Sequence, residues 1–215
     1  MNLLPFRLSM CALGALLLVA GCSVPQHSPT LGDDRVAAST LAVQVCASCH
    51  GSGGNATTPT FPKLAGQQKS YLAAQLNAYR AHTRADADAV AYMWGIAAHL
   101  SDAQIEGLAA YYQASPPLVR PAQDTSTAAM TPGRTLYQQG DAARGVPACA
   151  SCHGAGGAGS DAFPRLTGQH AAYVVKQLKV FQVTDQRPAG TAMKAVTHAL
   201  TPADMQAVAS YIGNL

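Results

Sequence analysis

Charged residues are scarce in this chain. Asp, Glu, Lys and Arg together make up 12% of its 215 residues, and the formal net charge is only +3. Because nucleic-acid binding depends on dense positive charge, the composition gives no case for a nucleic-acid partner. Strand patterns are missing too, since no segment alternates convincingly between apolar and polar residues, whereas several carry apolar residues at helical spacing. The predicted fold class is therefore all-α.

Long apolar runs are also lacking. The run from Leu8 to Ala20 is too short to cross a bilayer as a helix, but it suits the core of a signal peptide. It ends in small residues before Cys22, which resembles the bacterial lipobox, where the cysteine carries lipid. We expect a lipoprotein-type signal peptide over residues 1–21, a membrane anchor at Cys22 and a flexible tether over 22–35. The alternative is an ordinary cleaved signal peptide and a soluble exported protein.

Cysteines are few, and four of the six lie in two identical hexapeptides. Cys-Ala-Ser-Cys-His-Gly occupies residues 46–51 and again 149–154. C-x-x-C-H is the attachment sequence for covalent haem c, in which each thiol bonds one vinyl group and the histidine reaches the iron. The sequence therefore predicts two haems c. Their thioethers would be Cys46, Cys49, Cys149 and Cys152, and their proximal iron ligands His50 and His153.

Other uses of these cysteines fit the sequence less well. A zinc site would need further ligands at regular spacing, but Cys11 leaves with the signal peptide and Cys22 stands alone. A thioredoxin-like pair would need a βαβ context, which the sequence does not offer. A disulfide framework would not normally place two cysteines so close together before a histidine, twice.

The two halves of the chain form an internal repeat. Residues 61–67 (Phe-Pro-Lys-Leu-Ala-Gly-Gln) match residues 163–169 (Phe-Pro-Arg-Leu-Thr-Gly-Gln), and similar matches continue to the end of each half. This predicts two domains, 36–114 and 132–215, separated by a proline-rich linker over 115–131. Domains of this size have marginal cores, and a buried haem would supply the missing apolar mass.

Three helices are expected in each half. The first leads into the haem motif, and the middle ones span roughly 69–81 and 170–182. The final helices should begin at Ser101, with Gln104 in a capping box, and at Thr201, with a proline at the first helical position. Loops rich in Gly and Pro should wrap the haem after each motif.

The sixth iron ligand decides what each haem can do. Met93 and Met193 occupy equivalent repeat positions in stretches expected to be irregular, outside any apolar stripe, so we predict that they ligate the irons. Met205 instead falls in the stripe of the last helix and should be core. His99 and His198 are competing ligands, but their repeat positions are not equivalent. Two protein ligands leave no vacancy on the iron, which predicts an electron carrier.

Further residues should support the haems. The carbonyls of Pro62 and Pro164 are candidates to hold the second ring nitrogen of each proximal histidine. Arg84 and Arg187 would suit a haem propionate, although both could equally be solvated surface residues. Other histidines, His82 and His170 among them, are expected to be exposed.

With these residues placed, the chain resembles the dihaem cytochrome c4 family. The resemblance rests on residues 140–154, on the repeated Pro-x-Leu-x-Gly-Gln and Met-x6-Leu segments, and on Gly133-x-x-x-Tyr137, whose aromatic should pack near Tyr211. It implies two tandem class I cytochrome c domains related by a pseudo-two-fold, with neighbouring haem edges near the interface. It also implies periplasmic electron transfer towards a haem–copper terminal oxidase.

The sequence departs from that family in three places. The first domain lacks a clear Gly-x-x-x-aromatic helix. The family's glycine between the middle-helix aromatic and the arginine is absent, with His82 and Thr184 nearby, and its Asn-Asp after the arginine survives only as Ala85-Asp86. These departures affect the propionate assignments more than the iron ligands.

The expected function is a membrane-tethered electron carrier that takes electrons from a quinol-oxidising complex and passes them to an oxidase. Two alternatives stay open. One is a catalytic dihaem cytochrome, of the peroxidase or thiosulfate-oxidising type, which would need an open or differently ligated iron. The other is an electron-transfer subunit of a larger dehydrogenase or oxidase.

Overall fold

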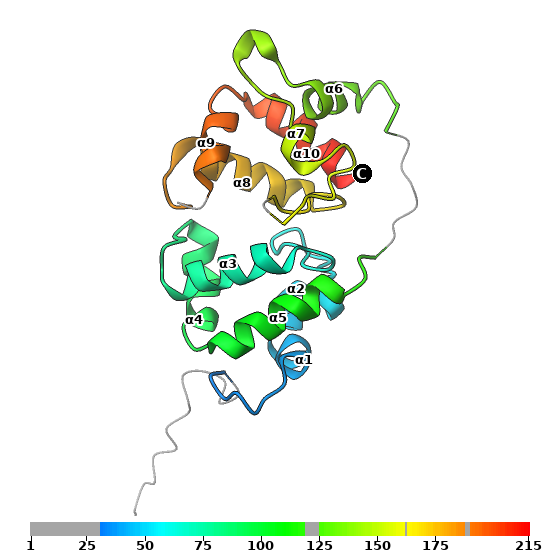
Figure 1. Cartoon of the computed structure of the whole chain (residues 1–215). Coiled ribbons are helices and arrows are strands. Elements are labelled where there is room, and N and C mark those ends of the chain that lie inside the picture. Colours follow the sequence, from blue (N-terminus) through cyan, green and yellow to red (C-terminus); the bar gives the residue numbers. More distant parts are fainter. Residues whose placement is uncertain (1–30, 119–124, 162, 188–189) are drawn as a thin grey trace, which may run out of the picture.

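The computed structural model describes residues 31–118, 125–161, 163–187 and 190–215. Over these ranges the chain folds into helices and loops, with only two isolated β-bridges, and Figure 1 shows two helical domains stacked one on the other. This confirms the all-α prediction. The predicted signal peptide, Cys22 and most of the tether lie outside the described residues. No helix in the described part of the chain is long and apolar enough to cross a membrane.

The first domain opens with one helical stretch that runs into the haem motif. It is built from α1 (Ala38–Leu41), a π-helical turn η1 (Ala42–Cys46) and α2 (Ala47–His50). The remaining elements are η2 (Ser52–Gly54), α3 (Lys69–Arg80), a second π-helical turn η3 (Ala89–Met93), α4 (Trp94–Ala97) and α5 (Asp102–Ala114).

In the second domain a separate helix precedes the haem motif. Its elements are α6 (Thr131–Gln139), η4 (Ala142–Arg144), α7 (Ala150–His153), α8 (Ala171–Val183), α9 (Thr191–Thr197) and α10 (Pro202–Gly213). The middle helices of both domains agree with the predicted spans to within about a residue, and both final helices begin where expected. α6 begins at Thr131, the last residue of the predicted linker. The domain boundaries stay a prediction.

Each domain has its own hydrophobic core. In the first it lies where α3 and α1 pack against α5, and in the second where α8 and α6 pack against α10. Met205 is 1% exposed at the centre of the second core, which confirms its predicted packing role. The first-domain helix starts at the expected capping box of Ser101 with Gln104. The second-domain helix starts at Thr201 as predicted, with Pro202 at its first position, and has a capping box with Asp204 that the sequence analysis did not identify.

A glycine lets the first and last helices of each domain approach closely. In the second domain it is Gly133 on α6, where an added Cβ would lie 2.1 Å from the Ala207 carbonyl oxygen of α10. Tyr137 from the same helix is fully buried, with its ring 5.4 Å from that of Tyr211, which confirms the predicted packing. In the first domain the glycine is on the last helix instead, as Gly107, facing the Ala38 methyl group on α1.

Two expectations about local structure were wrong. Met93 and Met193 do not lie in irregular stretches, because Met93 closes the π-helical turn η3 and Met193 lies within α9. Both elements are too short to show a helical period in the sequence. His170 is not exposed: it is half-buried between the domains, and its Nε2 lies 2.8 Å from the carbonyl oxygen of Ala56.

Candidate functional site

Each haem motif places its histidine at the end of a short helix and holds one of its ring nitrogens. His50 Nδ1 lies 2.9 Å from the carbonyl oxygen of Pro62, and His153 Nδ1 lies 2.9 Å from that of Pro164. A carbonyl can only accept, so Nδ1 carries the proton and the lone pair is on Nε2, as metal ligation requires. Burial lowers the pKa of both imidazoles, against the opposing effect of these carbonyls, which favours the neutral, ligating form.

An aromatic ring packs edge-on against each of these histidines. The Phe61 ring centroid is 6.1 Å from that of His50, and the Phe163 ring is 6.0 Å from His153. Both contacts restrict the tilt of the imidazole, in addition to the carbonyl bond. The sequence analysis did not assign a role to these residues, although their repetition before the matched prolines was a usable signal.

None of the four motif cysteines is in a disulfide. Before haem is attached, burial raises the pKa of the Cys46 thiol, and that of Cys149 to about 11. In the described ranges no group of three or more His, Cys, Asp or Glu side chains could hold a metal ion. The disulfide alternative is therefore wrong for these residues, and the zinc alternative finds no set of ligands.

In each domain, the first motif cysteine and the candidate methionine ligand pack against the same hydrophobic core. Cys46 and Met93 both pack, partly buried, against the first core, and Cys149 and Met193 pack against the second. Of the competing histidines, His99 is exposed, and the His198 ring lies 2.6 Å from the carbonyl oxygen of Ala195, one turn back on its own segment.

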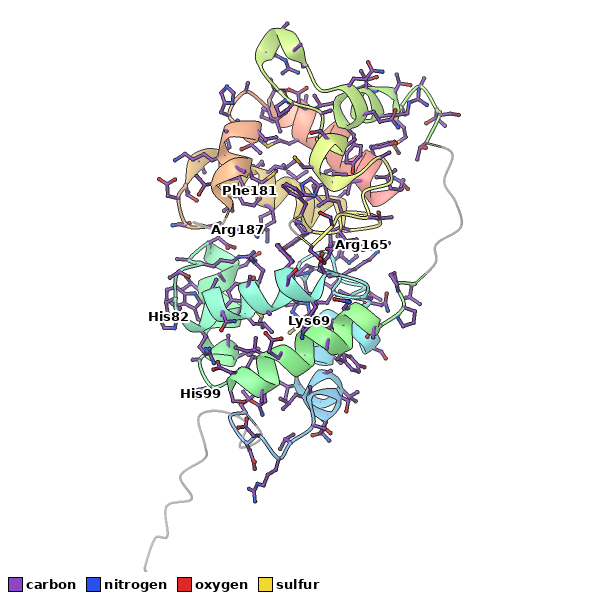
Figure 2. The ribbon with its side chains drawn as sticks, viewed as in Figure 1. Lys69, His82, His99, Arg165, Phe181 and Arg187 are labelled. Atoms are coloured by element: carbon purple, nitrogen blue, oxygen red, sulfur yellow. The ribbon has the colours of Figure 1, made fainter. Side chains whose placement is uncertain are left out.

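Arg84 and Arg187 are not surface residues. They are 4% and 9% exposed, which rules out the solvated alternative, and Figure 2 shows Arg187 at the boundary between the domains. Each guanidinium also lies over an aromatic ring of its own domain, with Arg84 Cζ 4.7 Å from the Tyr79 centroid and Arg187 Cζ 4.5 Å from that of Phe181.

The two arginines share a pair of equivalent glutamines across the interface. Arg84 donates to Gln75 Oε1 at 2.6 Å and to Gln177 Oε1 at 3.2 Å. Arg187 donates to Gln177 Oε1 at 2.5 Å and to Gln75 Oε1 at 3.1 Å. This crossed arrangement follows the pseudo-two-fold. It is broken by Asp86, whose carboxylate accepts from Arg84 Nε at 2.8 Å, and by Tyr71, whose hydroxyl accepts from Arg187 at 3.0 Å.

This cluster fits the carboxylates of haem. Within the described residues Arg187 has the neutral partners Gln177, Gln75 and Tyr71 and no carboxylate. Gln177 Nε2 is buried there with no acceptor. A buried cation and a buried donor without an acceptor are both costly, and a propionate oxygen would satisfy both.

A second symmetric set of bonds fixes the two domains together. Gln169 brackets Lys63, accepting from its backbone N–H at 2.9 Å and donating to its carbonyl at 3.0 Å. Gln67 brackets Arg165 in the same way, at 2.7 Å and 2.9 Å. These glutamines end the repeated Pro-x-Leu-x-Gly-Gln segments. The sequence analysis used those segments for alignment but missed their role in docking.

Comparisons with known proteins agree with this arrangement. The cytochrome c family matches residues 36–115 and 130–215. A cytochrome c4 from Azotobacter vinelandii is 38% identical, with 95% of this chain and 98% of the relative covered. A thiosulfate dehydrogenase electron acceptor from Thiomonas intermedia is 37% identical, covering 97% and 91%. The crystal structure of reduced cytochrome c4 from Pseudomonas stutzeri superposes with a TM-score of 0.73 at 36% identity, covering 86% and 99%.

Proposed function

The chain belongs to the cytochrome c family and is a dihaem electron carrier of the cytochrome c4 type rather than an enzyme; from this premise we propose that it works in the periplasm, tethered to a membrane by lipid on Cys22, and donates electrons to a haem–copper terminal oxidase. A quinol-oxidising complex is the proposed donor. The resemblance inferred from the motifs is thereby confirmed at the level of the family, and the chain carries two covalently bound haems c.

In this proposal each domain holds its haem through the same set of residues. The thioethers are Cys46 and Cys49 in the first domain and Cys149 and Cys152 in the second. The axial ligands are His50 with Met93, and His153 with Met193. Haem supplies an iron that accepts and returns one electron, and a thioether ligand raises its potential.

The observation that carries this assignment is the pair of histidines held by proline carbonyls. His50 and His153 are each buried, and each is oriented by a 2.9 Å contact between Nδ1 and a proline carbonyl oxygen. A histidine held in this way would keep its position on the iron when the iron gains or loses an electron. Arg84 and Arg187 are the proposed partners of the propionates, because both lie buried at the interface.

Replacing one methionine at a time tests the ligation. We expect Met93→His and Met193→His each to remove about half of the weak near-infrared Met–iron band of the oxidised holoprotein. Each should also lower only one of the two midpoint potentials in a spectropotentiometric titration, because imidazole favours ferrous iron less than a thioether does. Met205→Leu, a change in the core stripe, is the control and should leave the band intact. A full band in either histidine variant would refute the assignment.

The tether is tested separately from the haems. A Cys22→Ser variant should be released from washed membranes, while the unchanged protein should sediment with them until detergent is added. Equal release of both proteins would remove lipid from the proposal and leave the soluble periplasmic alternative. Purified haem–copper oxidase should oxidise the reduced carrier in a rapid-mixing experiment, and failure of that reaction would exclude it as the acceptor.

A second candidate donor is suggested by the relatives. Two of them are named as thiosulfate dehydrogenase electron acceptors, so a thiosulfate dehydrogenase could take the place of the quinol-oxidising complex. The test is to mix the oxidised carrier with purified thiosulfate dehydrogenase and thiosulfate and to follow haem reduction. Omitting the dehydrogenase distinguishes the carrier role from thiosulfate oxidation by the chain itself, which should be absent.

A further inference from the structure

An unusual backbone conformation occurs where the middle helix of the first domain ends. His82, two residues past the end of α3, has φ +56°, which makes it the one non-glycine residue with positive φ in the described part of the chain. Side chains rarely adopt this left-handed region, and the conformation costs free energy unless the surroundings hold it in place. The sequence analysis assigned His82 no role beyond exposure.

The contact that holds this residue is an aromatic stack. The His82 imidazole lies on the Trp94 indole with 4.1 Å between ring centroids and 9° between ring planes. Trp94 is fixed from a second direction, because its indole N–H donates to the Arg84 carbonyl at 2.8 Å. Figure 2 shows His82 at the edge of the first domain, beside the end of α3.

This stack closes a loop around the proposed iron ligand. Trp94 directly follows Met93 and begins α4, while His82 and Arg84 lie two and four residues past the end of α3. The ring contact and the indole hydrogen bond therefore tie both ends of the segment that delivers Met93. A shift of the Met93 backbone away from the core would strain both contacts.

The second domain closes the corresponding loop with an ion pair. Lys194 directly follows Met193, and its ammonium lies 2.5 Å from the carboxylate of Asp185, in the turn after α8. The two side chains are 48% and 84% exposed, so this contact lies in solvent and is screened by salt. A stack of two aromatic rings has no such dependence.

We propose that His82 is a positioning residue that holds Met93 on the first iron through Trp94, and that the Asp185–Lys194 ion pair does the same for Met193. The inference rests on the methionine ligation proposed above. It follows that raising the salt concentration loosens the Met193–iron bond and leaves the Met93–iron bond unchanged.

Imidazole competition measures both bonds in the intact oxidised holoprotein. Imidazole displaces a methionine from ferric haem, and loss of the near-infrared band reports it at each site. Replacing His82 by Asn keeps a residue that tolerates positive φ but removes the ring, whereas His82→Phe keeps a ring for the stack. We expect H82N to raise imidazole affinity about threefold to tenfold at one haem only, and H82F to restore it most of the way.

Asp185→Asn is the matched variant in the second domain. It should raise the affinity about twofold at the other haem, and that haem alone should respond when sodium chloride is raised from 50 mM to 1 M in the unchanged protein. Equal imidazole affinities in H82N and the unchanged protein would overturn the positioning role of His82. An absent Met–iron band in the unchanged protein would instead overturn the ligation, so the two failures are distinguishable.

Discussion

Arg84 and Arg187 occupy equivalent positions on opposite sides of the domain interface, yet only Arg84 has a carboxylate partner among the residues that the structure describes. The offset between equivalent residues falls from 103 at the arginines to 100 at the methionines, so the segment after Arg84 is the longer one. That segment contains Asp86, which pairs with Arg84, and Asp88, which reaches Lys176 of the other domain. The pseudo-two-fold is thus kept by hydrogen bonds to glutamine side chains, and the two aspartates of the longer segment depart from it.

The two domains also differ in how they fix their first and last helices. In the second domain Gly133 faces backbone atoms of α10, whereas in the first Gly107 faces only the methyl group of Ala38. The capping boxes differ in charge: Gln104 is neutral, but Asp204 is a carboxylate that also accepts from Arg144 at 2.6 Å. Each difference can be tested by a variant in one domain and its match in the other.

The largest effect is expected from Asp86→Asn. Arg84 and Asp86 are 4% and 1% exposed, and Asp86→Asn removes the one protein carboxylate that pairs with this buried guanidinium among the described residues. Breaking a buried pair in this way costs about 3 kcal/mol. Urea unfolding of the holoprotein should therefore show a clearly lower midpoint, read from circular dichroism and from haem absorbance because a two-domain protein need not unfold in one step.

Asp88→Asn is the control for this variant. Unlike Arg84, its partner Lys176 lies in the other domain, at 2.5 Å. The Asp88 and Lys176 side chains are about one third and two fifths exposed, so the loss should stay below about 1 kcal/mol. Similar midpoints for the two variants would mean that Arg84 is neutralised by another group, such as a propionate of the bound haem.

Much of this architecture could be predicted from the sequence because the signals were local. C-x-x-C-H predicts a haem by its spacing alone. The capping box at Ser101 and the Thr201-Pro202 pair each mark a helix start within four residues of chain. The Pro62 and Pro164 carbonyls could be predicted because the repeated segment places one proline after the haem motif of each half.

The remaining features depend on residues far apart in the chain. Gln67 and Arg165 are separated by 98 positions, and nothing in either segment alone indicates that one brackets the other. The His82–Trp94 stack requires a backbone conformation that propensities disfavour, so local reasoning points away from it. The glycine of the first domain was missed because the expected motif lies on the first helix, whereas Gly107 lies on the last.

A smaller effect is expected when the helix-crossing glycines are replaced. In Gly133→Ala the new methyl group would meet the Ala207 carbonyl oxygen at 2.1 Å, so the backbone of α10 must move. We expect a loss of about 2 kcal/mol, typical of overpacking where no side chain can yield. Thermal unfolding of the holoprotein by calorimetry should show the second domain melting earlier and the first unchanged.

Gly107→Ala should cost less, about 1 kcal/mol, because the new methyl group meets only the Ala38 side chain, at 2.7 Å, and alanine is the better helix former. The double variant Ala38→Gly with Gly107→Ala moves the glycine to the first helix, as in the second domain, and should recover most of the loss. A double variant no more stable than Gly107→Ala would show that the contact between these two positions does not set the helix approach.

The smallest effect concerns acid stability and the charged capping box. The Arg144 guanidinium lowers the pKa of Asp204 to about 2, from an ordinary value of 3.8, aided by the N–H and hydroxyl groups of Thr201 and opposed by burial. A lowered pKa in the folded state stabilises the protein above the unfolded pKa, and this stabilisation is lost as the pH falls from about 4 towards 2. Because the pair is partly exposed and screened by solvent, the loss should be at most about 1 kcal/mol.

Asp204→Asn and Arg144→Gln should each flatten this part of the pH dependence of the unfolding midpoint. Asp33 beside Arg35 also has a pKa lowered to about 2, so the unchanged protein keeps some acid sensitivity from the start of the first domain. Subtracting the curve of each variant from that of the unchanged protein removes this shared part. The difference should then belong to the second domain, since the first closes its capping box with the uncharged Gln104. Equal slopes between pH 4 and pH 2 in all three proteins would show that the two capping boxes respond alike to acid.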